Sequence, residues 1–393
     1  MKLLWVKTDF LHPTTRGGQI RTLETLRRLH QWHEVHYVAF DDPAQPEGLA
    51  RSFEYCAKAY PVAHRVAEKT SVRFALQLVE GLFSRMPVAV SRYRSAAMRR
   101  KLEELLRRER FDSVVCDFLF PSPNFSRLEG CVLFQHNVES TIWKRYVEHN
   151  SGLKKLYFQL QAKRMSRYEG KVCRSVRKVV AVSDGDAEAM RREYKVERVF
   201  AAPTGVDLDY FARPEGGKKL ADMVFLGSMD WMPNIDGVTW FAREVLPLIH
   251  AKMPECTLAI AGRRPAPEVS RLAEKDRRIK VTGTVPDVRP WLFGSLISIV
   301  PLRIGGGTRL KIYESMAAGT PVVSTAVGAE GLDVSDGANI CLSDSPADFA
   351  GRCLQLLENA TERERLSRAA WELVASKYSW DVVARGMERL LFD

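Results

Sequence analysis

The sequence contains no apolar run long enough to cross a bilayer as a helix, which takes about 20 consecutive apolar residues. Its first residues, MKLLWVKTDF, include no apolar segment of signal-peptide length before charged residues follow. From these two absences we expect a cytoplasmic protein, with any membrane contact peripheral and on the inner face of the membrane.

The cysteines show no sign of disulfide pairing. The seven cysteines are widely spaced, odd in number and form no CxxC motif. This pattern argues against a disulfide framework or a zinc site and predicts reduced thiols buried in the cores. The histidines of HQWHEVH (30–36) lead into a predicted strand, which would point them in different directions. DLD (207–209) and DGD (184–186) have the DxD pattern of some metal sites. The first falls in the predicted linker and the second at a helix start, where acids act as caps, so we interpret both as structural. We therefore expect no metal and no cofactor.

Helix-turn-helix, zinc-finger and RNP patterns are missing, so we expect no nucleic-acid partner despite a net charge of +11. Residues 1–210 carry about all of this charge and concentrate it at 91–110 and 144–179. Among the cations of 144–179, apolar residues recur at helical spacing at Leu153, Leu156, Tyr157 and Leu160. Such a segment is either a solvated helix that packs on its own domain or a helix that binds an anionic membrane surface.

Short β-branched runs alternate with longer amphipathic stretches, which is the pattern of parallel sheets covered by helices. In the first half, strands are predicted at 3–6, 35–40, 113–116, 131–135 and 178–183, and helices near 18–31, 70–85, 94–109, 141–176 and 184–194. After a turn-rich linker at 203–219, strands are predicted at 223–227, 257–262, 279–283, 295–302 and 321–325. The predicted fold class is α/β, with two Rossmann-like doubly wound parallel-sheet domains facing across a cleft.

Ligands of doubly wound sheets bind beyond the carboxyl ends of the strands, so residues at those ends are the candidate site residues. Glycines at such positions let a ligand approach the backbone closely. This rule selects Gly17, Gly18, His136, Gly227, Gly262, Gly283, Gly305, Gly306 and Gly307. Both halves of the chain contribute, which predicts that ligands bind in a cleft between two domains.

The stretch GGGTRLKIYE (305–314) is the most informative of these strand ends. Its glycines free the backbone amides to turn toward one anion, and Thr308 suits the N-cap of the helix that follows. Lys311 and Glu314 share a face of that helix, whose start suits phosphate. Glu314 lies further along the helix, where a carboxylate can accept hydrogen bonds from a diol such as ribose. The stretch is neither a Walker A loop nor a GxGxxG motif. It predicts a nucleotide diphosphate lying across the helix start.

Several strings of the sequence resemble GT4-type glycosyltransferases, which have the GT-B fold. They are GGGTRLKIYESMAAGTPVVSTAVGAEGL (305–332), VVAVSDGDAEAM (179–190), PTGVDLDYF (203–211), LAIAGRRP (258–265) and VTGTVPDVRPWL (281–292). QHNVES (135–140) and DWMPN (230–234) resemble a bacterial exopolysaccharide-associated subgroup, and YSWDVVARGMERLL (378–391) resembles the family's last helix. The resemblance implies an acceptor-side domain over 1–205 that the helix 379–393 joins, and a nucleotide-sugar-binding domain over 206–378.

The resemblance implies a metal-independent retaining enzyme that moves a sugar from a nucleotide-diphosphate sugar to a hydroxyl of a glycan or lipid-linked acceptor. Its role would lie in the synthesis of cell-surface polysaccharides or glycoconjugates. By the same resemblance, His136 and Glu314 are catalytic, and Arg21, Asn137 and Glu139 lie on the acceptor side. The donor phosphates are assigned to Gly17, Gly18, Gly305, Gly306, Gly307, Thr308, Arg309 and Lys311. The nucleotide is assigned to Gly227, Ser228, Asn234, Gly262, Arg263, Gly283, Val285 and Glu314.

The sequence departs from the family's pattern at a few positions. Gly306 stands where relatives often keep the first acid of an ExxxxxxxE motif, of which Glu314 is the second acid. The usual Gly-Arg and Lys after the first strand of the second domain are replaced by LGSMDWMPN (226–234), so Arg309 and Lys311 are expected to neutralise the pyrophosphate. Thr204 replaces an asparagine. Two other interpretations stay open: another GT-B-fold sugar-nucleotide enzyme such as an epimerase, and a basic membrane-surface protein with a vestigial nucleotide site.

Overall fold

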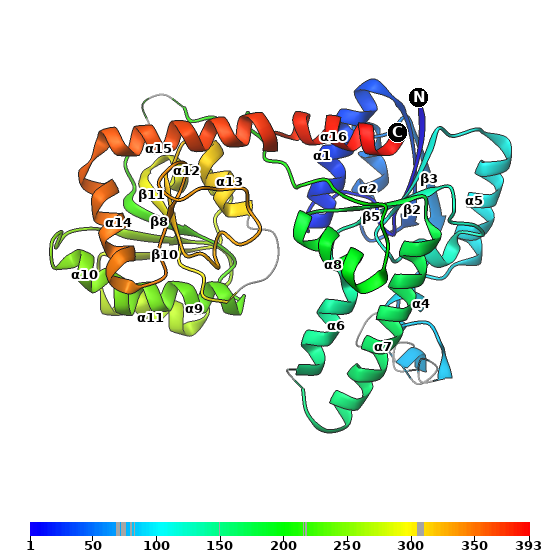
Figure 1. Ribbon diagram of the computed structural model, residues 1–393, viewed down its shortest axis with the longest axis horizontal. Coiled ribbons are helices and arrows are strands. Elements are labelled where there is room, and N and C mark those ends of the chain that lie inside the picture. The colour runs from blue at the N-terminus through cyan, green and yellow to red at the C-terminus, as the bar shows by residue number, and fades with distance from the viewer. Residues whose placement is uncertain are drawn as a thin grey trace. The chain divides into compact units, whose positions relative to one another are not determined.

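The chain folds into two compact units, Met1–Thr204 with Val383–Asp393 and Gly205–Val382 (Figure 1). The computed structural model describes residues 1–67, 71, 76–78, 81, 83–148, 150–214, 216, 218–304 and 310–393. The first unit therefore ends one residue before the predicted boundary at 205, and residues 379–382 belong to the second unit.

The first unit contains a seven-stranded sheet in which every pair of neighbouring strands is parallel, in the order β3-β2-β1-β4-β5-β6-β7. The strands are β1 (Lys2–Val6), β2 (Glu34–Asp41), β3 (Lys58–Ala63), β4 (Ser113–Asp117), β5 (Cys131–Gln135), β6 (Lys178–Ala181) and β7 (Val199–Ala201). The chain builds outward from β1 to β3 and then returns to β4, so the strand order reverses between β1 and β4.

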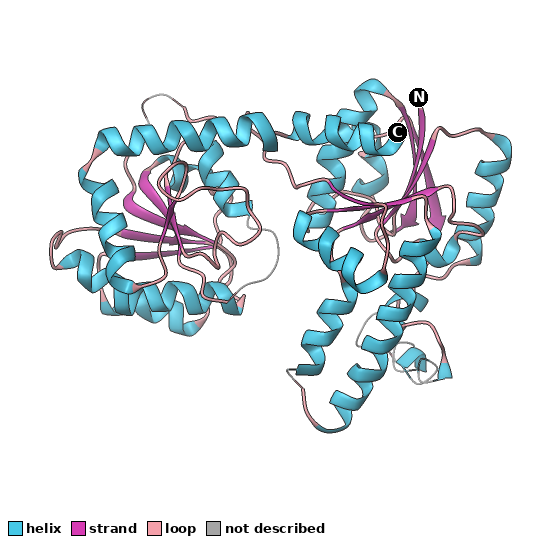
Figure 2. Cartoon of the chain, in the orientation of Figure 1, coloured by secondary structure: helices cyan, strands magenta, loops and turns pink. Residues whose placement is uncertain are grey.

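Helices cover both faces of this sheet (Figure 2). They are α1 (Gly17–Trp32), α2 (Glu47–Ala50), α4 (Val88–Ser91), α5 (Ala96–Arg108), α6 (Glu139–Glu148), α7 (Gly152–Ser175) and α8 (Asp184–Tyr194), with α16 (Trp380–Phe392) from the chain end. Alternate residues of β1 separate two cores, because Leu3 and Trp5 pack with α1 and α16, whereas Leu4 and Val6 pack with α5, α7 and α8. Glu388 accepts a hydrogen bond from His33 at 2.8 Å and fastens α16 to the end of α1.

The second unit contains a six-stranded parallel sheet in the order β10-β9-β8-β11-β12-β13. Its strands are β8 (Ala221–Leu226), β9 (Leu258–Ala261), β10 (Ile279–Gly283), β11 (Ser295–Val300), β12 (Val322–Ser324) and β13 (Cys341–Leu342). Its helices are α9 (Met232–Trp240), α10 (Leu246–His250), α11 (Pro267–Lys275), α12 (Arg289–Phe293), α13 (Leu310–Ala317), α14 (Pro346–Glu358) and α15 (Ala360–Leu373). The order again reverses at one place, between β8 and β11, and the predicted fold of two Rossmann-like domains is confirmed.

Some local predictions differ from the structure. The stretch predicted as one helix at 141–176 is a hairpin of α6 and α7, because Gly152 adopts φ +59° at the start of α7. The edge strands β3 and β7 were not predicted, and part of the helix predicted near 70–85 lies outside the described residues. The predicted buried free thiols are confirmed, since all seven cysteines are buried and unpaired.

Candidate functional site

In the second unit, two glycines bring the ends of neighbouring strands into close contact. Gly227 follows β8 and Gly262 follows β9, and a Cβ atom built on Gly262 would lie 1.7 Å from the Gly227 carbonyl oxygen. No side chain fits at position 262, so the predicted glycine there is required by packing of backbone on backbone. The two loops therefore form a surface of bare backbone beside the point where the strand order reverses.

A lysine amine lies on this backbone surface. Lys311 Nζ donates a hydrogen bond to Asn234 Oδ1 at 2.8 Å, and a Cβ on Gly227 would approach the same nitrogen to 3.0 Å. Asn234 Nδ2 in turn donates to the Ser228 carbonyl at 2.8 Å, which orients the amide so that its oxygen faces the ammonium. Lys311 Nζ also lies 4.5 Å from the centre of the Phe225 ring. The cation is held in place at the carboxyl end of β8, as an anion site requires.

Glu314 lies one turn further along α13 than Lys311. Within the described part of the chain no hydrogen bond to its carboxylate is recorded, although Ser315, next in sequence, is bonded to Ser298 of β11 at 2.9 Å. The side chain is only partly exposed, and burial raises the pKa of Glu314 while Lys311 opposes the shift. A free carboxylate beside a fixed ammonium offers acceptors to one part of a ligand and a cation to another.

The other residues predicted to bind the nucleotide lie around these loops. Arg263 Nε donates to Ser228 Oγ at 2.9 Å and links the loop after β9 to the loop after β8. Gly283, with φ +69°, ends the edge strand β10, and Val285 follows it. The phosphate-binding residues predicted from the glycine-rich stretch, Gly305, Gly306, Gly307, Thr308 and Arg309, lie outside the described residues. The structure thus brings together Gly227, Ser228, Asn234, Gly262, Arg263 and Lys311.

The first unit has its own polar centre, built on Asp117 at the carboxyl end of β4. The parallel register of β1 and β4 sets Lys7 beside this fully buried carboxylate, at 2.8 Å from Oδ1. Trp5 Nε1 and Thr22 Oγ1 both donate to Oδ2 at 2.7 Å. Burial alone would raise the pKa of Asp117, but Lys7 and His136 lower it well below its ordinary value. The carboxylate is therefore ionised and fully hydrogen-bonded.

His136, predicted from its place after β5, is one of these partners. Its Nε2 lies 2.6 Å from Asp117 Oδ1, and its Nδ1 lies 2.9 Å from Arg21 Nη1. Burial, together with Lys7 and Arg21, lowers the pKa of His136 to about 4 against the opposing effect of Asp117. The ring is neutral at pH 7. Because the Asp117 carboxylate can only accept and the Arg21 guanidinium can only donate, Nε2 carries the hydrogen and Nδ1 accepts. Both ring nitrogens are thus engaged within the protein.

The glycine pair after β1 lies against this histidine. Gly17 and Gly18 form the first turn of α1, and a Cβ on Gly18 would lie 3.5 Å from His136 Nδ1. Phe118, directly after Asp117, has φ +78°, a region that non-glycine residues rarely adopt, and its ring meets His136 edge-on at 5.4 Å. Such backbone strain is concentrated at functional sites. The N-terminus of α1, the strained turn and the histidine therefore meet where the strand order reverses.

Glu139 and Asn137, predicted on the acceptor side, lie at the start of α6. Asn137 is exposed, whereas the Glu139 side chain is buried and no hydrogen bond to its carboxyl group is recorded within the described residues. Burial, and then repulsion by Glu169, raises the pKa of Glu139 to about 8. Glu169 of α7 accepts hydrogen bonds from the backbone amides of Glu139 and Ser140 at 2.9 Å and so caps α6 from a neighbouring helix.

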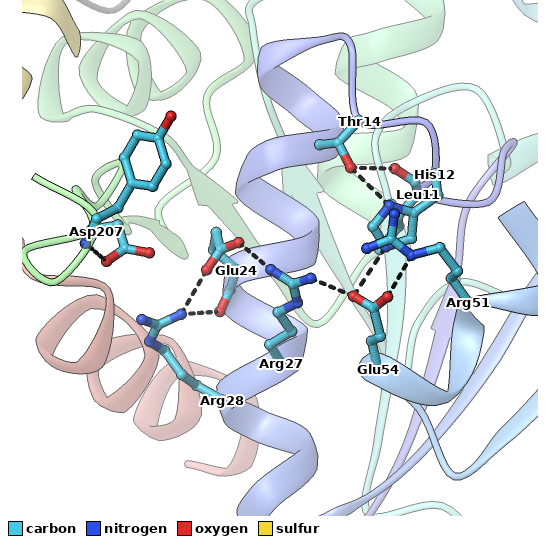
Figure 3. A network of polar contacts seen from close by, with 10 residues as sticks. Leu11, His12, Thr14, Glu24, Arg27, Arg28, Arg51, Glu54 and Asp207 are labelled. Carbon is cyan, nitrogen blue, oxygen red and sulfur yellow. Dashed lines mark hydrogen bonds and ion pairs between the residues drawn. The ribbon is translucent and has the colours of Figure 1, made fainter. Parts of the chain in front are cut away.

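A cavity of about 570 Å³ opens at the carboxyl ends of β1 and β2, near the N-terminus of α1. Its polar lining includes Asp9, His12, Arg16, Gln19, Asp41, Asp42, His64, Arg65 and Tyr93. His12 lies 3.3 Å from Glu54, whose carboxylate also binds Arg27 and Arg51 (Figure 3). Burial would raise the pKa of Glu54, but the hydrogen bonds from Arg51 and Arg27 lower it to about 2. This charged network holds one wall of the cavity.

Several of these groups were not predicted from the sequence. Asp117 ends the apolar run SVVCD, and an acid at a strand end was the available signal. Lys7 directly follows the strand predicted at 3–6, so it carried the same signal, whereas Glu169 gave no local signal because it acts on residues distant in sequence. Across the described residues, no group of three or more histidine, cysteine and acidic side chains is arranged to hold a metal ion. Metal independence stays a prediction.

Comparisons with known proteins identify related families. A family model described as "Glycosyltransferase Family 4" matches residues 15–210, and one described as "Glycosyl transferases group 1" matches residues 221–359. An uncharacterised 44.6 kDa protein of the cps region of Klebsiella pneumoniae is 21% identical over 96% of both chains. A D-inositol 3-phosphate glycosyltransferase of Mycolicibacterium smegmatis is 29% identical over 208 residues, which are 47% of this chain and 44% of that protein.

Solved structures share the fold over the whole chain. Anabaena HepE, solved with UDP and glucose, superposes with a TM-score of 0.64 at 14% identity and covers 100% of this chain and 99% of its own. The sucrose-phosphate synthase of Thermosynechococcus elongatus gives a TM-score of 0.66 at 15% identity, with 99% and 98% covered. At such low identity these likenesses show the fold alone.

Proposed function

Because the chain belongs to the GT4-type glycosyltransferases, we propose that it transfers a sugar from a nucleotide-diphosphate sugar to an acceptor hydroxyl with retention of anomeric configuration. In the reaction, the bond between the anomeric carbon and the phosphate oxygen breaks, and a bond from that carbon to the acceptor oxygen forms on the same face. The acceptor hydroxyl passes its proton to the departing phosphate oxygen, and the leaving group is released as the nucleoside diphosphate. No metal is part of the proposal.

The observation that carries the proposal is the ammonium of Lys311, fixed by Asn234 over the bare backbone at Gly227. As the sugar leaves, negative charge grows on the departing diphosphate. A cation already held in place stabilises this charge without reorganisation, which is the form of electrostatic catalysis that lowers barriers most. The free carboxylate of Glu314, one turn away, is placed to accept hydrogen bonds from the ribose of the same nucleotide.

The acceptor is assigned to the first unit, where the cavity at the ends of β1 and β2 offers carboxylates, cations and the Tyr93 ring. Such mixed polar and aromatic linings bind sugars through hydroxyl hydrogen bonds and stacking. His136 acts in this proposal by positioning, since its two nitrogens hold Arg21 and Asp117 and its ring supports Gly18. The acceptor in this proposal is a glycan or a lipid-linked molecule of cell-surface polysaccharide synthesis, and the relative from a cps region is in keeping with that role.

The donor is tested first by titration calorimetry with UDP, GDP and ADP and with their sugars, with UDP as the leading candidate because HepE was solved with it. We expect Lys311→Ala to lower the affinity for the best diphosphate by about ten-fold or more, as for loss of a charge-assisted hydrogen bond. Lys252→Ala, at an exposed lysine of the same unit, is the matched control. Unchanged affinity in Lys311→Ala would count against the site.

Activity separates the proposal from the two other interpretations. A transferase releases free nucleotide diphosphate in step with acceptor glycosylation, and NMR of the product reports the anomeric configuration. An epimerase would convert the sugar nucleotide without any acceptor. A surface-binding protein with a vestigial site would bind without turnover. Inversion at the anomeric carbon would contradict the retaining mechanism alone.

A further inference from the structure

Over the outer half of the α6–α7 hairpin, none of the residues that the structure describes is buried. The two helices lie side by side and extend away from the sheet of the first unit (Figure 1). No described residue from 141 to 160 is buried, although α7 becomes buried nearer the sheet, from Gln161 onward. Trp143 packs against the core of the first unit, and beyond it the outer half of the hairpin does not serve as a wall of the domain core.

The exposed surface of this outer half is apolar at its tip. Leu153 is 85% exposed and Leu156 is 61% exposed, both in the first turns of α7. Behind them, Tyr146 of α6 stacks on Phe158 of α7 at 5.6 Å, with Trp143 at 6.1 Å from Phe158. Exposed leucines next to an aromatic cluster are typical of segments that insert at the boundary between lipid headgroups and acyl chains.

A second apolar element lies beside α7. The carbonyl of Gly81 accepts a hydrogen bond from Arg164, and the Val88 amide donates to Gln161 Oε1 at 3.0 Å. Near Gly81, Phe83 is 87% exposed and Leu76 is 58% exposed. Exposed apolar side chains therefore also occur in a segment that is hydrogen-bonded to the inner half of α7.

Cations surround these apolar side chains. Residues 144–167 carry seven lysines and arginines against the single acid Glu148. Within the described part of the chain, no ion pair is recorded for Lys154, Lys155, Lys163 or Arg167. Lys154 and Lys155 directly separate the two exposed leucines. Charges left without acidic partners around an apolar tip are complementary to a surface that is anionic outside and apolar inside.

We propose that the outer half of the α6–α7 hairpin docks the protein on an anionic lipid bilayer. The leucines enter the headgroup boundary while the lysines stay among the lipid phosphates. The docking is peripheral, and in the described residues no helix is long and apolar enough to cross a bilayer. The proposal goes beyond sugar transfer and does not rest on it.

The test is co-sedimentation of the full chain with vesicles of phosphatidylcholine that contain either no or one-third phosphatidylglycerol. We expect binding only to the anionic vesicles, weakened by salt. The double variant Leu153→Ser with Leu156→Ser should bind about ten-fold more weakly or worse. Lys154→Glu with Lys155→Glu should lose about 25-fold or more, because each cation near such a surface contributes about five-fold.

Two controls on α5 distinguish vesicle binding by the hairpin tip from vesicle binding by positive charge in general. Leu106→Ser removes another exposed leucine, and Arg100→Glu with Arg107→Glu makes the same change in net charge on another basic helix. These variants should bind like the unmodified protein. Equal losses in controls and hairpin variants would overturn the proposal, as would absence of vesicle binding by the unmodified chain. Binding of an acidic protein instead of vesicles would also overturn it.

Depth of insertion gives a direct readout. All seven native cysteines are buried, so a thiol introduced by Leu153→Cys can be labelled selectively with a polarity-sensitive dye. Its emission should shift to the blue on anionic vesicles, whereas the same dye at Leu106→Cys should not shift. Circular dichroism and thermal unfolding show that each variant is folded. A vesicle-bound protein with no shift at position 153 would contradict insertion of the tip.

Discussion

The His136 ring and the Asp117 carboxylate share a hydrogen bond of 2.6 Å in the interior of the first unit. This bond fixes which ring nitrogen carries the hydrogen, so the other nitrogen can accept from Arg21. The positions of α1, β4 and β5 are thereby linked at the reversal of strand order. Both ring nitrogens of the histidine are engaged by its neighbours, and we expect the charges in this centre to contribute to stability.

The Asp117 carboxylate is predicted to be a major source of stability. Asp117→Asn leaves the Lys7 ammonium buried without a counter-charge and sets an amide group among four donors. We expect a loss of about 3–5 kcal/mol in the free energy of unfolding, measured with urea at pH 7. Thr22→Val removes only one of these hydrogen bonds and should cost about 1 kcal/mol. Equal effects of the two variants would show that the charge is unimportant.

Arg21 is predicted to keep His136 neutral. Its guanidinium faces Nδ1 at 2.9 Å and adds to the effect of burial, which is the main cause of the low pKa of about 4. Arg21→Met should therefore raise the pKa of His136, which NMR titration of the ring protons measures. Arg28→Met, on the same helix, is the control and should leave the pKa of His136 unchanged. An unchanged value in Arg21→Met would mean that burial and Lys7 set the protonation state without Arg21.

The raised pKa of Glu139 predicts that the protein loses stability as pH rises. Its pKa is about 8 when folded against an ordinary value of 4.5, so between these values the folded state binds a proton that the unfolded state releases. The contribution is present in full below pH 4.5 and is lost as pH rises through 8. Glu139→Gln should be more stable than the unmodified protein at pH 8.5 by about 2–5 kcal/mol, and equal to it at pH 4.5.

Urea unfolding at the two pH values measures this difference. The control is Glu129→Gln, at an exposed glutamate, which should change stability equally little at both. A variant at position 139 whose stability falls with pH as steeply as that of the unmodified protein would assign the pH dependence to other groups.

The topology and the candidate residues for binding the sugar donor could be predicted, because both follow from local rules. Alternating β-branched and amphipathic segments give the two parallel sheets, and strand ends locate Gly227 and Gly262 at adjacent loops. Helical periodicity sets Lys311 and Glu314 on one face. Their closeness in the structure agrees with these rules, while their binding roles stay predictions.

The carboxyl pair of Glu139 and Glu169 could not be predicted in the same way. A single helix over 141–176 would separate positions 139 and 169 by about 45 Å, at 1.5 Å per residue. The reversal at Gly152 instead returns Glu169 to the first turn of α6. The pairing of Lys7 with Asp117 likewise depends on the register between β1 and β4. Contacts set by one loop conformation or one strand register are not encoded in the local pattern.

The close approach of Gly262 to Gly227 is predicted to tolerate no side chain. In Gly262→Ala the new Cβ would lie 1.7 Å from the Gly227 carbonyl oxygen, and only movement of the backbone can relieve such a clash. We expect a loss of about 1–3 kcal/mol or more in unfolding free energy, with weaker diphosphate binding because Lys311 and Asn234 contact the same loop. The matched control is Gly351→Ala in α14, where nothing lies within 4 Å and helix propensity should add about 0.5–1 kcal/mol. Gain of stability in both variants would show that the loops after β8 and β9 can separate without cost.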